Sequence, residues 1–318
     1  MSNIEKAGSG SCRKKRSFWT RLKIDLKRNK TLYISIIPVI LFYIVFCYLP
    51  MYGILMAFED YNPAQGLFDS KWIGLANFKE FFSGIYFKRT LFNTLNISIS
   101  SLLWGFPAPI ILALMMNELS NRYFKKTVQT IVYLPHFVSL IVICGMIQMF
   151  TSERGVINDL IALFGGTRSS LLNNPDCFVP VYVISDIWQQ VGWNSIIYMA
   201  ALAGISQELY EAAKVDGANR LQQTIHVTLP GLVPTIVTLL ILRMGSILNV
   251  GYEKIILLYN PINYEKSDVI SSYVYRVGMQ DFRYGFSTAV GLFNSAIGCI
   301  IVFIANTINR KINETSLW

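Results

Sequence analysis

The chain has few charged residues for its length. Only 15% of its 318 residues are Asp, Glu, Lys or Arg, whereas 53% are hydrophobic. Soluble domains average roughly 25% charged residues, so this shortage excludes an ordinary soluble protein and indicates a membrane protein. The 17 Tyr and 20 Phe fit the aromatic belts that membrane proteins place at lipid–water interfaces.

Residues that could carry catalysis or bind a metal are also scarce. The five cysteines are scattered, mostly inside apolar runs, and form neither a disulfide framework nor a metal-binding spacing. The two histidines, His136 and His226, do not form a His-x-x-x-His pair, and we interpret each as structural. The sequence also has no Gly-rich loop that ends in Gly-Lys-Ser or Gly-Lys-Thr. We therefore predict no catalytic residue, no metal site and no cofactor in this chain, and we expect no nucleic-acid partner.

Long apolar runs dominate the rest of the chain. A membrane-spanning helix needs about 20 predominantly apolar residues, and six stretches meet this requirement. They are residues 32–58, 91–116, 128–150, 179–205, 232–250 and 286–306. The sequence therefore predicts an all-α transmembrane domain of six spans within residues 31–318. The spans do not resemble one another closely, which disfavours the inverted-repeat architecture of many secondary transporters.

The basic N-terminal segment, residues 1–30, predicts the orientation of the chain. It contains ten Lys or Arg and two acidic residues, and Lys and Arg are enriched on the cytoplasmic side of membranes. With this segment inside, the cytoplasmic segments hold 17 basic and 7 acidic residues, and the outer segments hold 10 and 11. Both termini are therefore expected in the cytoplasm. The segment could lie on anionic lipid as an amphipathic helix or form a disordered tail, and the sequence leaves both open.

A polar interlude separates the fourth and fifth spans over residues 206–231, which we call the elbow. Ser206 can cap a first helix over residues 207–216, because its hydroxyl can accept from a free amide of the first turn. Gly217 should end that helix, since glycine enters the left-handed region without a Cβ penalty.

A second elbow helix is expected over residues 220–228, with Asn219 as its cap. It should end before Pro230, because proline lacks an amide proton and crowds the preceding turn. The resulting helix, glycine turn and helix would present a small apolar face beside charged side chains. Such a surface suits a protein partner.

The elbow contains three blocks at fixed spacing: Glu-Ala-Ala, then Asp-Gly-Ala after two residues, then Leu-Pro with a second proline four residues on. This pattern resembles the cytoplasmic loop of binding-protein-dependent ABC importer permeases, although Thr224 stands where the sugar importers commonly have phenylalanine. A chance surface elbow is the alternative. The resemblance implies that the following residues contact an ATPase subunit: Glu211, Ala212, Ala213, Asp216, Gly217, Ala218, Leu229 and Pro230.

Three further segments extend the resemblance over nearly the whole chain. WIGLANFKEFF (72–82) resembles an outer segment of sugar-type permeases, and YLPHFVS (133–139) and DVISSYVYRVG (268–278) are similar to the oligosaccharide and polysaccharide subgroup. The resemblance implies a six-span type I ABC importer permease in the bacterial cell membrane. It also implies its partners, which are a second homologous permease, an extracellular solute-binding protein and two ATPase subunits that bind ATP and Mg.

One face of the fourth span carries unusual polarity for a membrane segment. Asp186, Gln189, Gln190, Trp193, Asn194 and Ile197 recur at spacings of three and four. Amides can hydrogen-bond hydroxyls and an indole offers a flat apolar face, which suits a sugar. The alternative is that these groups hold helices together. The residues expected to line a substrate pathway are Gln189, Gln190, Trp193, Asn194, Asn249, Tyr252 and Asn294.

Two charged residues, Asp186 and Arg243, lie within predicted spans at matching depths of roughly 10 Å from the outer side. An unpaired charge in a span is costly, at about 2.5 to 3.5 kcal/mol by the lower estimates. We therefore expect them to pair, directly or through water. Arg243 could instead extend to the outer surface or pair with a partner permease.

The sequence thus predicts a permease subunit for an oligosaccharide or polysaccharide fragment, which works by alternating access and is not itself an enzyme. The energy would come from ATP hydrolysed on separate subunits. One alternative changes the cargo to a peptide, polyamine or other small solute. Another is a stand-alone channel or secondary transporter.

Overall fold

The computed structural model describes residues 27–313, and the chain divides into two compact units, residues 1–53 and 54–318. Nearly all regular structure in the described part is helical, which confirms the all-α prediction. The first unit contains α2 (Lys30–Phe42), the π-helical η1 (Tyr43–Tyr48) and the start of the 3₁₀ segment η2 (Leu49–Phe58). Most of the predicted basic segment, residues 1–26, lies outside the described residues.

The second unit opens with a short antiparallel pairing of β1 (Glu59–Asp60) and β2 (Lys71–Trp72), in which Glu59 lies opposite Trp72. Its first helical segments are α3 (Ala76–Ser83), α4 (Ile85–Ser100), η3 (Ser101–Gly105), α5 (Pro107–Glu118), α6 (Arg122–Tyr133), η4 (Leu134–Phe137), α7 (Leu140–Thr151), α8 (Val156–Leu163), η5 (Leu171–Asn173) and α9 (Pro175–Ala203). The remaining segments are α10 (Gln207–Val215), α11 (Arg220–Gln223), η6 (Thr224–Thr228), α12 (Leu229–Gly245), α13 (Tyr252–Leu258), α14 (Tyr264–Ser267), α15 (Ile270–Tyr275), η7 (Arg276–Gln280) and α16 (Tyr284–Asn313).

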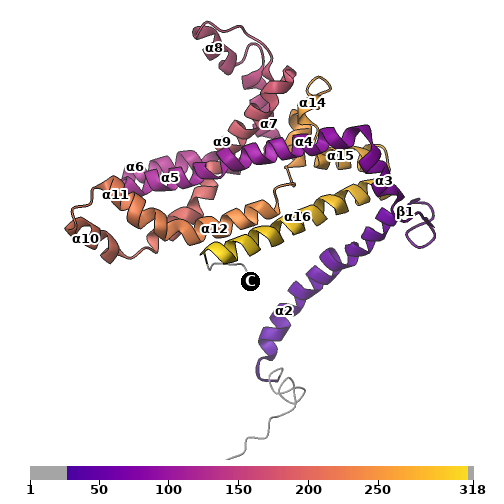
Figure 1. Ribbon diagram of the computed structural model, residues 1–318, viewed down its shortest axis with the longest axis horizontal. Coiled ribbons are helices and arrows are strands. Elements are labelled where there is room, and N and C mark those ends of the chain that lie inside the picture. The colour runs from indigo at the N-terminus through magenta and orange to yellow at the C-terminus, as the bar shows by residue number, and fades with distance from the viewer. Residues whose placement is uncertain (1–26, 314–318) are drawn as a thin grey trace, which may run out of the picture. The chain divides into compact units, whose positions relative to one another are not determined.

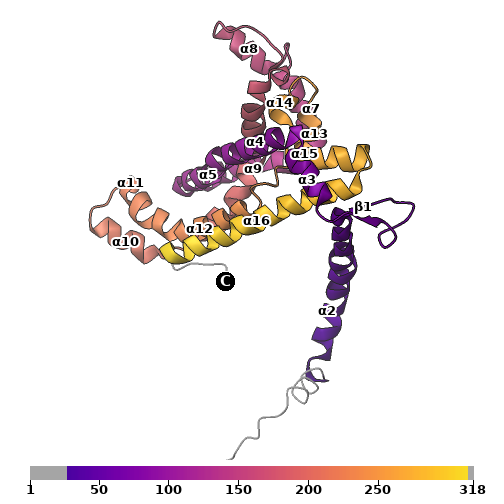
Figure 2. The same cartoon turned by 45° about the vertical axis from the view of Figure 1, so that its right-hand side comes forward.

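Helix α9 is the central element of the second unit, and it packs against α4, α5, α6 and α12. Buried residues of three of these helices meet in one cluster, formed by Ala113, Tyr198, Leu202 and Leu232. Figures 1 and 2 show α10 and α11 at one end of α5 and α12, with α3 and α15 at the far end of this unit. The elbow and the α3–α15 region therefore lie at opposite ends of the helices.

A buried carboxylate fixes the segment that follows α13. Asp268 is fully buried and accepts hydrogen bonds from Arg89 of α4, at 3.0 Å, and from Arg276, at 2.7 Å. Burial disfavours the charged guanidinium, but the hydrogen bonds and negative charge of Asp268 raise the pKa of Arg276 above its ordinary value. Because the carboxylate has two cationic partners, it ties α4 to the α15–η7 segment.

Five helical stretches of the described chain are long and apolar enough to cross a membrane. They are Lys30–Phe58, Ile85–Glu118, Leu140–Leu163, Arg220–Gly245 and Tyr284–Thr307. The predicted fourth span corresponds to α9, whose 29 residues reach about 43 Å at 1.5 Å per residue. Its length is therefore sufficient, while its polar face lowers its apolar character.

The third predicted span is broken, which corrects the expectation of a continuous helix over residues 128–150. Helix α6 passes into the 3₁₀ turn η4, which contains Pro135, and Val138 is extended before α7 begins. Ser139 caps α7, because its hydroxyl accepts from the amide of Val142. The missing proline amide and the serine cap together restart the helix here.

Candidate functional site

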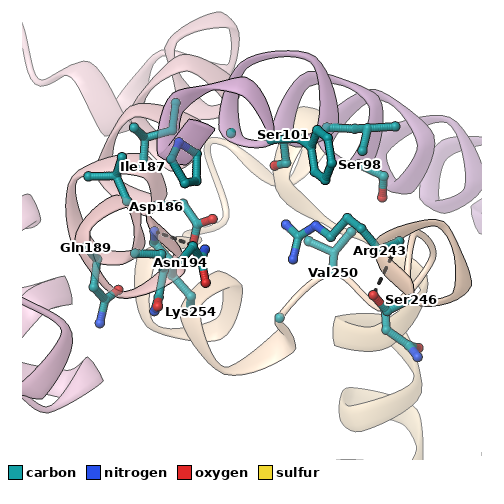
Figure 3. A pocket seen from close by; sticks show the side chains of 18 of the residues that line it. Ser98, Ser101, Asp186, Ile187, Gln189, Asn194, Arg243, Ser246, Val250 and Lys254 are labelled. Carbon is teal, nitrogen blue, oxygen red and sulfur yellow. Dashed lines mark hydrogen bonds and ion pairs between the residues drawn. The ribbon is translucent and has the colours of Figure 1, made fainter. Parts of the chain in front are cut away.

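A cavity of about 800 Å³ lies beside α9. Its walls come from α4, η3 and the start of α5, from the η4 turn and the start of α7, from α9, and from α12 with the loop and first turn of α13 that follow. Figure 3 shows part of this lining. This volume falls within the range of small-molecule sites, roughly 300–1,000 Å³. The cavity is therefore large enough for a solute of several rings.

Four of the seven predicted pathway residues line this cavity: Gln189, Gln190, Asn194 and Asn249. Both predicted charged residues, Asp186 and Arg243, line it as well. The polar face of the fourth span thus points into a cavity. Whether a substrate passes along it stays a prediction.

The other three predicted pathway residues lie outside the lining. Trp193 stacks on His136 with ring centroids 4.3 Å apart, and Tyr252 stacks on Tyr275 at 5.7 Å. Asn294 of α16 is buried and donates a hydrogen bond to the side-chain oxygen of Asn249, at 3.0 Å. It therefore positions a lining residue instead of facing the cavity itself.

His136 connects the break in the third span to the cavity wall. Its ring nitrogen Nδ1 lies 2.9 Å from Oε1 of Gln190, within hydrogen-bonding distance, while its ring faces Trp193. These two contacts with α9 hold the η4 turn in place. His136 also lines the cavity, although the sequence suggested only a structural role.

The predicted direct pair between Asp186 and Arg243 is wrong. The carboxylate of Asp186 instead lies 3.5 Å from the ammonium of Lys254, whose side chain is almost completely buried and also donates to the carbonyl of Tyr182 at 3.3 Å. A buried ammonium needs a partner far more than an exposed guanidinium does. Arg243 is exposed within the cavity and forms no ion pair with any described residue.

Several lining residues were not predicted from the sequence. Lys254 and Glu253 lie at the start of the seven-residue helix α13, in a segment assigned to the outer surface. Charged residues are common in such segments and do not by themselves indicate a site. Ser98 and Ser101 lie where α4 passes into the π-helical η3. The helical register changes at that point, so regular spacing along α4 does not predict which side chains face the cavity.

The elbow has the predicted cap and turn. Ser206 accepts from the amide of Glu208, and Gly217 has a φ of 80°, in the left-handed region. The amide of Ala218 bonds to the carbonyl of Ala213 at 2.9 Å, and that of Gly217 to Lys214 at 3.1 Å. This pair of bonds is a Schellman motif, which satisfies the free carbonyls at the end of α10.

The second elbow helix does not end before Pro230, which corrects the prediction. Asn219 caps α11 in a capping box with Gln222, in which each side chain accepts a hydrogen bond from the backbone amide of the other residue. The backbone then continues through the π-helical η6 into α12, without interruption to Gly245. A π-turn shifts the hydrogen-bond register just before Pro230, so the proline does not break the helix.

The eight predicted ATPase-contact residues lie in two groups. Glu211, Ala212 and Ala213 lie on α10 and lead into Asp216, Gly217 and Ala218 at the turn, whereas Leu229 and Pro230 open α12. Glu211, Ala212, Asp216 and Gly217 are exposed. A shallow hollow of about 310 Å³ lies between the turn and η6 and is lined by Ala213, Asp216, Gly217, Ala218, Gln222, His226 and Val227.

Residues 105–314, which include most of the cavity lining and the whole elbow, match the family model described as "Binding-protein-dependent transport system inner membrane component". The chain belongs to this family. It is a family of membrane transport proteins, so the chain is a multi-pass membrane permease. The elbow lies inside the matched region and the predicted outer segment 72–82 does not.

Several members of this family are similar over nearly their whole length. Protein LplB of Bacillus subtilis (strain 168) is 46% identical over 294 residues, which cover 92% of each chain. The polygalacturonan/rhamnogalacturonan transport system permease protein YteP of the same organism is 42% identical, over 94% of this chain and 93% of its own.

A solved structure shows the same fold. It is the crystal structure of a bacterial ABC transporter involved in the import of the acidic polysaccharide alginate, and one of its chains is 46% identical. The match covers 92% of this chain and 99% of that chain, with a TM-score of 0.85. This similarity confirms the predicted transmembrane fold of a type I ABC importer permease.

Proposed function

We propose that this chain is the permease subunit of an ATP-driven importer for oligosaccharide fragments of an acidic polysaccharide. The observation that carries the proposal is near-full-length similarity to a permease named for polygalacturonan and rhamnogalacturonan and to an importer of alginate. The cavity supports it, because amide, hydroxyl and charged side chains line a space large enough for a short sugar chain.

The partners follow from the family and the exposed elbow. A second permease would complete the pathway, and an extracellular solute-binding protein would deliver the sugar; a related alginate importer has been solved with a "pentasaccharide-bound periplasmic protein". Of two ATPase subunits, which would bind ATP and Mg, one would dock on the elbow of this chain and the other on the second permease. This arrangement puts the elbow and both termini in the cytoplasm of a bacterial cell.

The mechanism would be alternating access. Closure of the ATPase subunits would push on α10 and the Gly217 turn, and α12 would carry that movement to the cavity wall because it is continuous with the elbow. The sugar would be released on the cytoplasmic side when the helices around the cavity reorient. The chain itself would make and break no covalent bond.

The experiment is to purify a tagged chain from its own cells, identify the proteins that accompany it, and reconstitute the complex in liposomes with the binding protein. We expect two ATPase subunits and a second permease to accompany it, and uptake of short galacturonate oligomers that requires ATP. Uptake by the chain alone without ATP would show a channel or secondary transporter. ATP-dependent uptake of a peptide or polyamine, with no uptake of any sugar, would overturn the cargo class.

A further inference from the structure

The cavity contains one cation that is paired with a carboxylate and one that has no ion-pair partner among residues 27–313. Its lining includes four charged residues, Asp186, Glu253, Arg243 and Lys254. Lys254 is only 4% exposed, and its ammonium is held by Asp186 and by the carbonyl of Tyr182. Arg243 forms no ion pair with a described carboxylate. The two cations therefore differ in their availability to a solute.

The position of Arg243 favours a positive charge although no described carboxylate pairs with it. It lies in the last turn of α12, where the helix carbonyls favour a positive charge. The amides of Ser246 and Ile247 take two of the nearby carbonyls, those of Arg243 and Met244, and the helix ends at Gly245. Arg243 is also exposed, so its charge is partly solvated while its guanidinium remains free to bind.

The side chain of Arg243 points into the cavity. Figure 3 shows Arg243 extending into the cavity from one side, whereas Asp186, Asn194 and Lys254 lie on the opposite side. An anionic group between the two sides would bind the guanidinium of Arg243 in preference, because the ammonium of Lys254 is already held by Asp186 and the carbonyl of Tyr182. A guanidinium can bind a carboxylate through two parallel hydrogen bonds, which a lysine cannot do.

We propose that Arg243 is the residue that recognises the carboxylate of a sugar acid inside the permease, while Asp186 keeps Lys254 from doing so. This inference rests on the proposed function. It assigns selection for charge to the permease cavity itself, in addition to any selection by the binding protein. Asn194 and Asn249 would then hydrogen-bond the hydroxyls of the same sugar unit.

The test compares two cargoes that differ only in charge, trigalacturonate and its fully methyl-esterified form, as stimulators of ATP hydrolysis by the reconstituted complex. The binding protein is loaded with cargo and added at a saturating concentration, so that delivery of the cargo does not limit the measured ATP hydrolysis. Arg243→Gln should reduce stimulation by the acid roughly tenfold, the loss expected for a charged hydrogen bond, and leave that by the ester within about twofold. Arg243→Lys should recover only part of the response to the acid.

Arg122→Gln supplies the matched control, because Arg122 is an exposed residue at the start of α6, outside the cavity lining. An equal loss for acid and ester in Arg243→Gln, with less complex recovered, would overturn the proposal and indicate an ion pair with the partner permease. Stimulation of the wild type by neutral sugars but not by the acid would overturn both this proposal and the acidic cargo of the proposed function, and would leave only ATP-driven import of a neutral sugar. If no oligosaccharide stimulates the wild-type complex, the proposed function itself fails.

Discussion

At the scale of single residues, the cavity depends on one ion pair between α9 and α13. Asp186 has 29% of its side chain exposed, whereas Lys254 is almost fully enclosed. The lysine therefore depends on the carboxylate more than the reverse. The hydrogen bond from Lys254 to the carbonyl of Tyr182, at 3.3 Å, neutralises no charge and cannot replace the pair.

Asp186→Asn should lower the stability of the folded chain by about 1–3 kcal/mol, because it leaves the buried ammonium without a counter-charge. The measurement is the midpoint of thermal unfolding in detergent. Asp159→Asn is the matched control, since Asp159 and Arg168 form an exposed pair worth roughly 0.2–1 kcal/mol. If Asp186→Asn and Lys254→Met destabilise separately and the double variant shows their sum, the two residues do not form a stabilising pair.

At the scale of the helices, close approach matters most where α9 crosses α6. A Cβ atom at Gly192 would lie 2.1 Å from the carbonyl oxygen of Val132, so the two helices must separate to accept a side chain there. The contacts of His136 with Gln190 and Trp193 lie next to the same crossing. The geometry of the cavity wall therefore depends on the absence of a side chain at one position.

Gly192→Ala should reduce folded yield and lower the unfolding midpoint, because backbone atoms cannot move away as a flexible side chain could. Gly145→Ala in α7 is the matched control, since its Cβ would meet nothing within 4 Å. That variant should be neutral or stabilising by about 0.5–1 kcal/mol, because alanine favours helices over glycine. Equal behaviour of the two variants in fluorescence-detected gel filtration would contradict the close crossing.

The turn of the elbow gives a second test at this scale. Gly217→Val should strain the backbone by about 1–3 kcal/mol, because a β-branched residue disfavours the left-handed region. We expect transport to fall while insertion into the membrane persists. Gly217→Asn is the control, since asparagine enters that region more readily. Normal transport and normal ATPase coupling in the valine variant would remove the turn from the mechanism.

Caps and turns were predictable from the sequence, because Ser206, Gly217 and Asn219 act through their own neighbours in the chain. The corrected predictions all involve non-standard helical turns or distant partners. The local effect of proline predicted that the second elbow helix ends before Pro230, but the helical backbone continues through the π-turn of η6 into α12. Depth in the membrane suggested Arg243 as the partner of Asp186, whereas the fold of α13 brings Lys254 closer.

At the scale of the whole molecule, the elbow end of the second unit has a mixed surface. The elbow end presents the exposed apolar side chains of Leu209, Val215 and Leu221 beside charged residues. Arg220 also reaches Glu118 at the end of α5, at 3.5 Å. An exposed surface with apolar and charged groups is what a protein partner requires.

Glu211→Lys should weaken attachment of the ATPase subunits, because it reverses an exposed charge at the proposed contact. The measurement is the ratio of ATPase to permease after co-purification, with salt held constant. Glu208→Lys makes the same change in the first turn of the same helix. If only the helix dipole mattered, Glu208→Lys would lose about 0.3–1 kcal/mol of stability, Glu211→Lys would lose less because Glu211 lies beyond the first turn, and neither variant would lose ATPase.

The uninterrupted helical backbone from Arg220 to Gly245 has a thermodynamic consequence. It contains 26 residues and so extends about 39 Å, from the elbow to the turn that holds Arg243. If this helix transmits movement between its two ends, occupancy at one end changes affinity at the other, and the two effects must be equal in size. If bound sugar raises the affinity of the permease for the ATPase subunits by some factor, bound ATPase must raise its affinity for the sugar by that same factor.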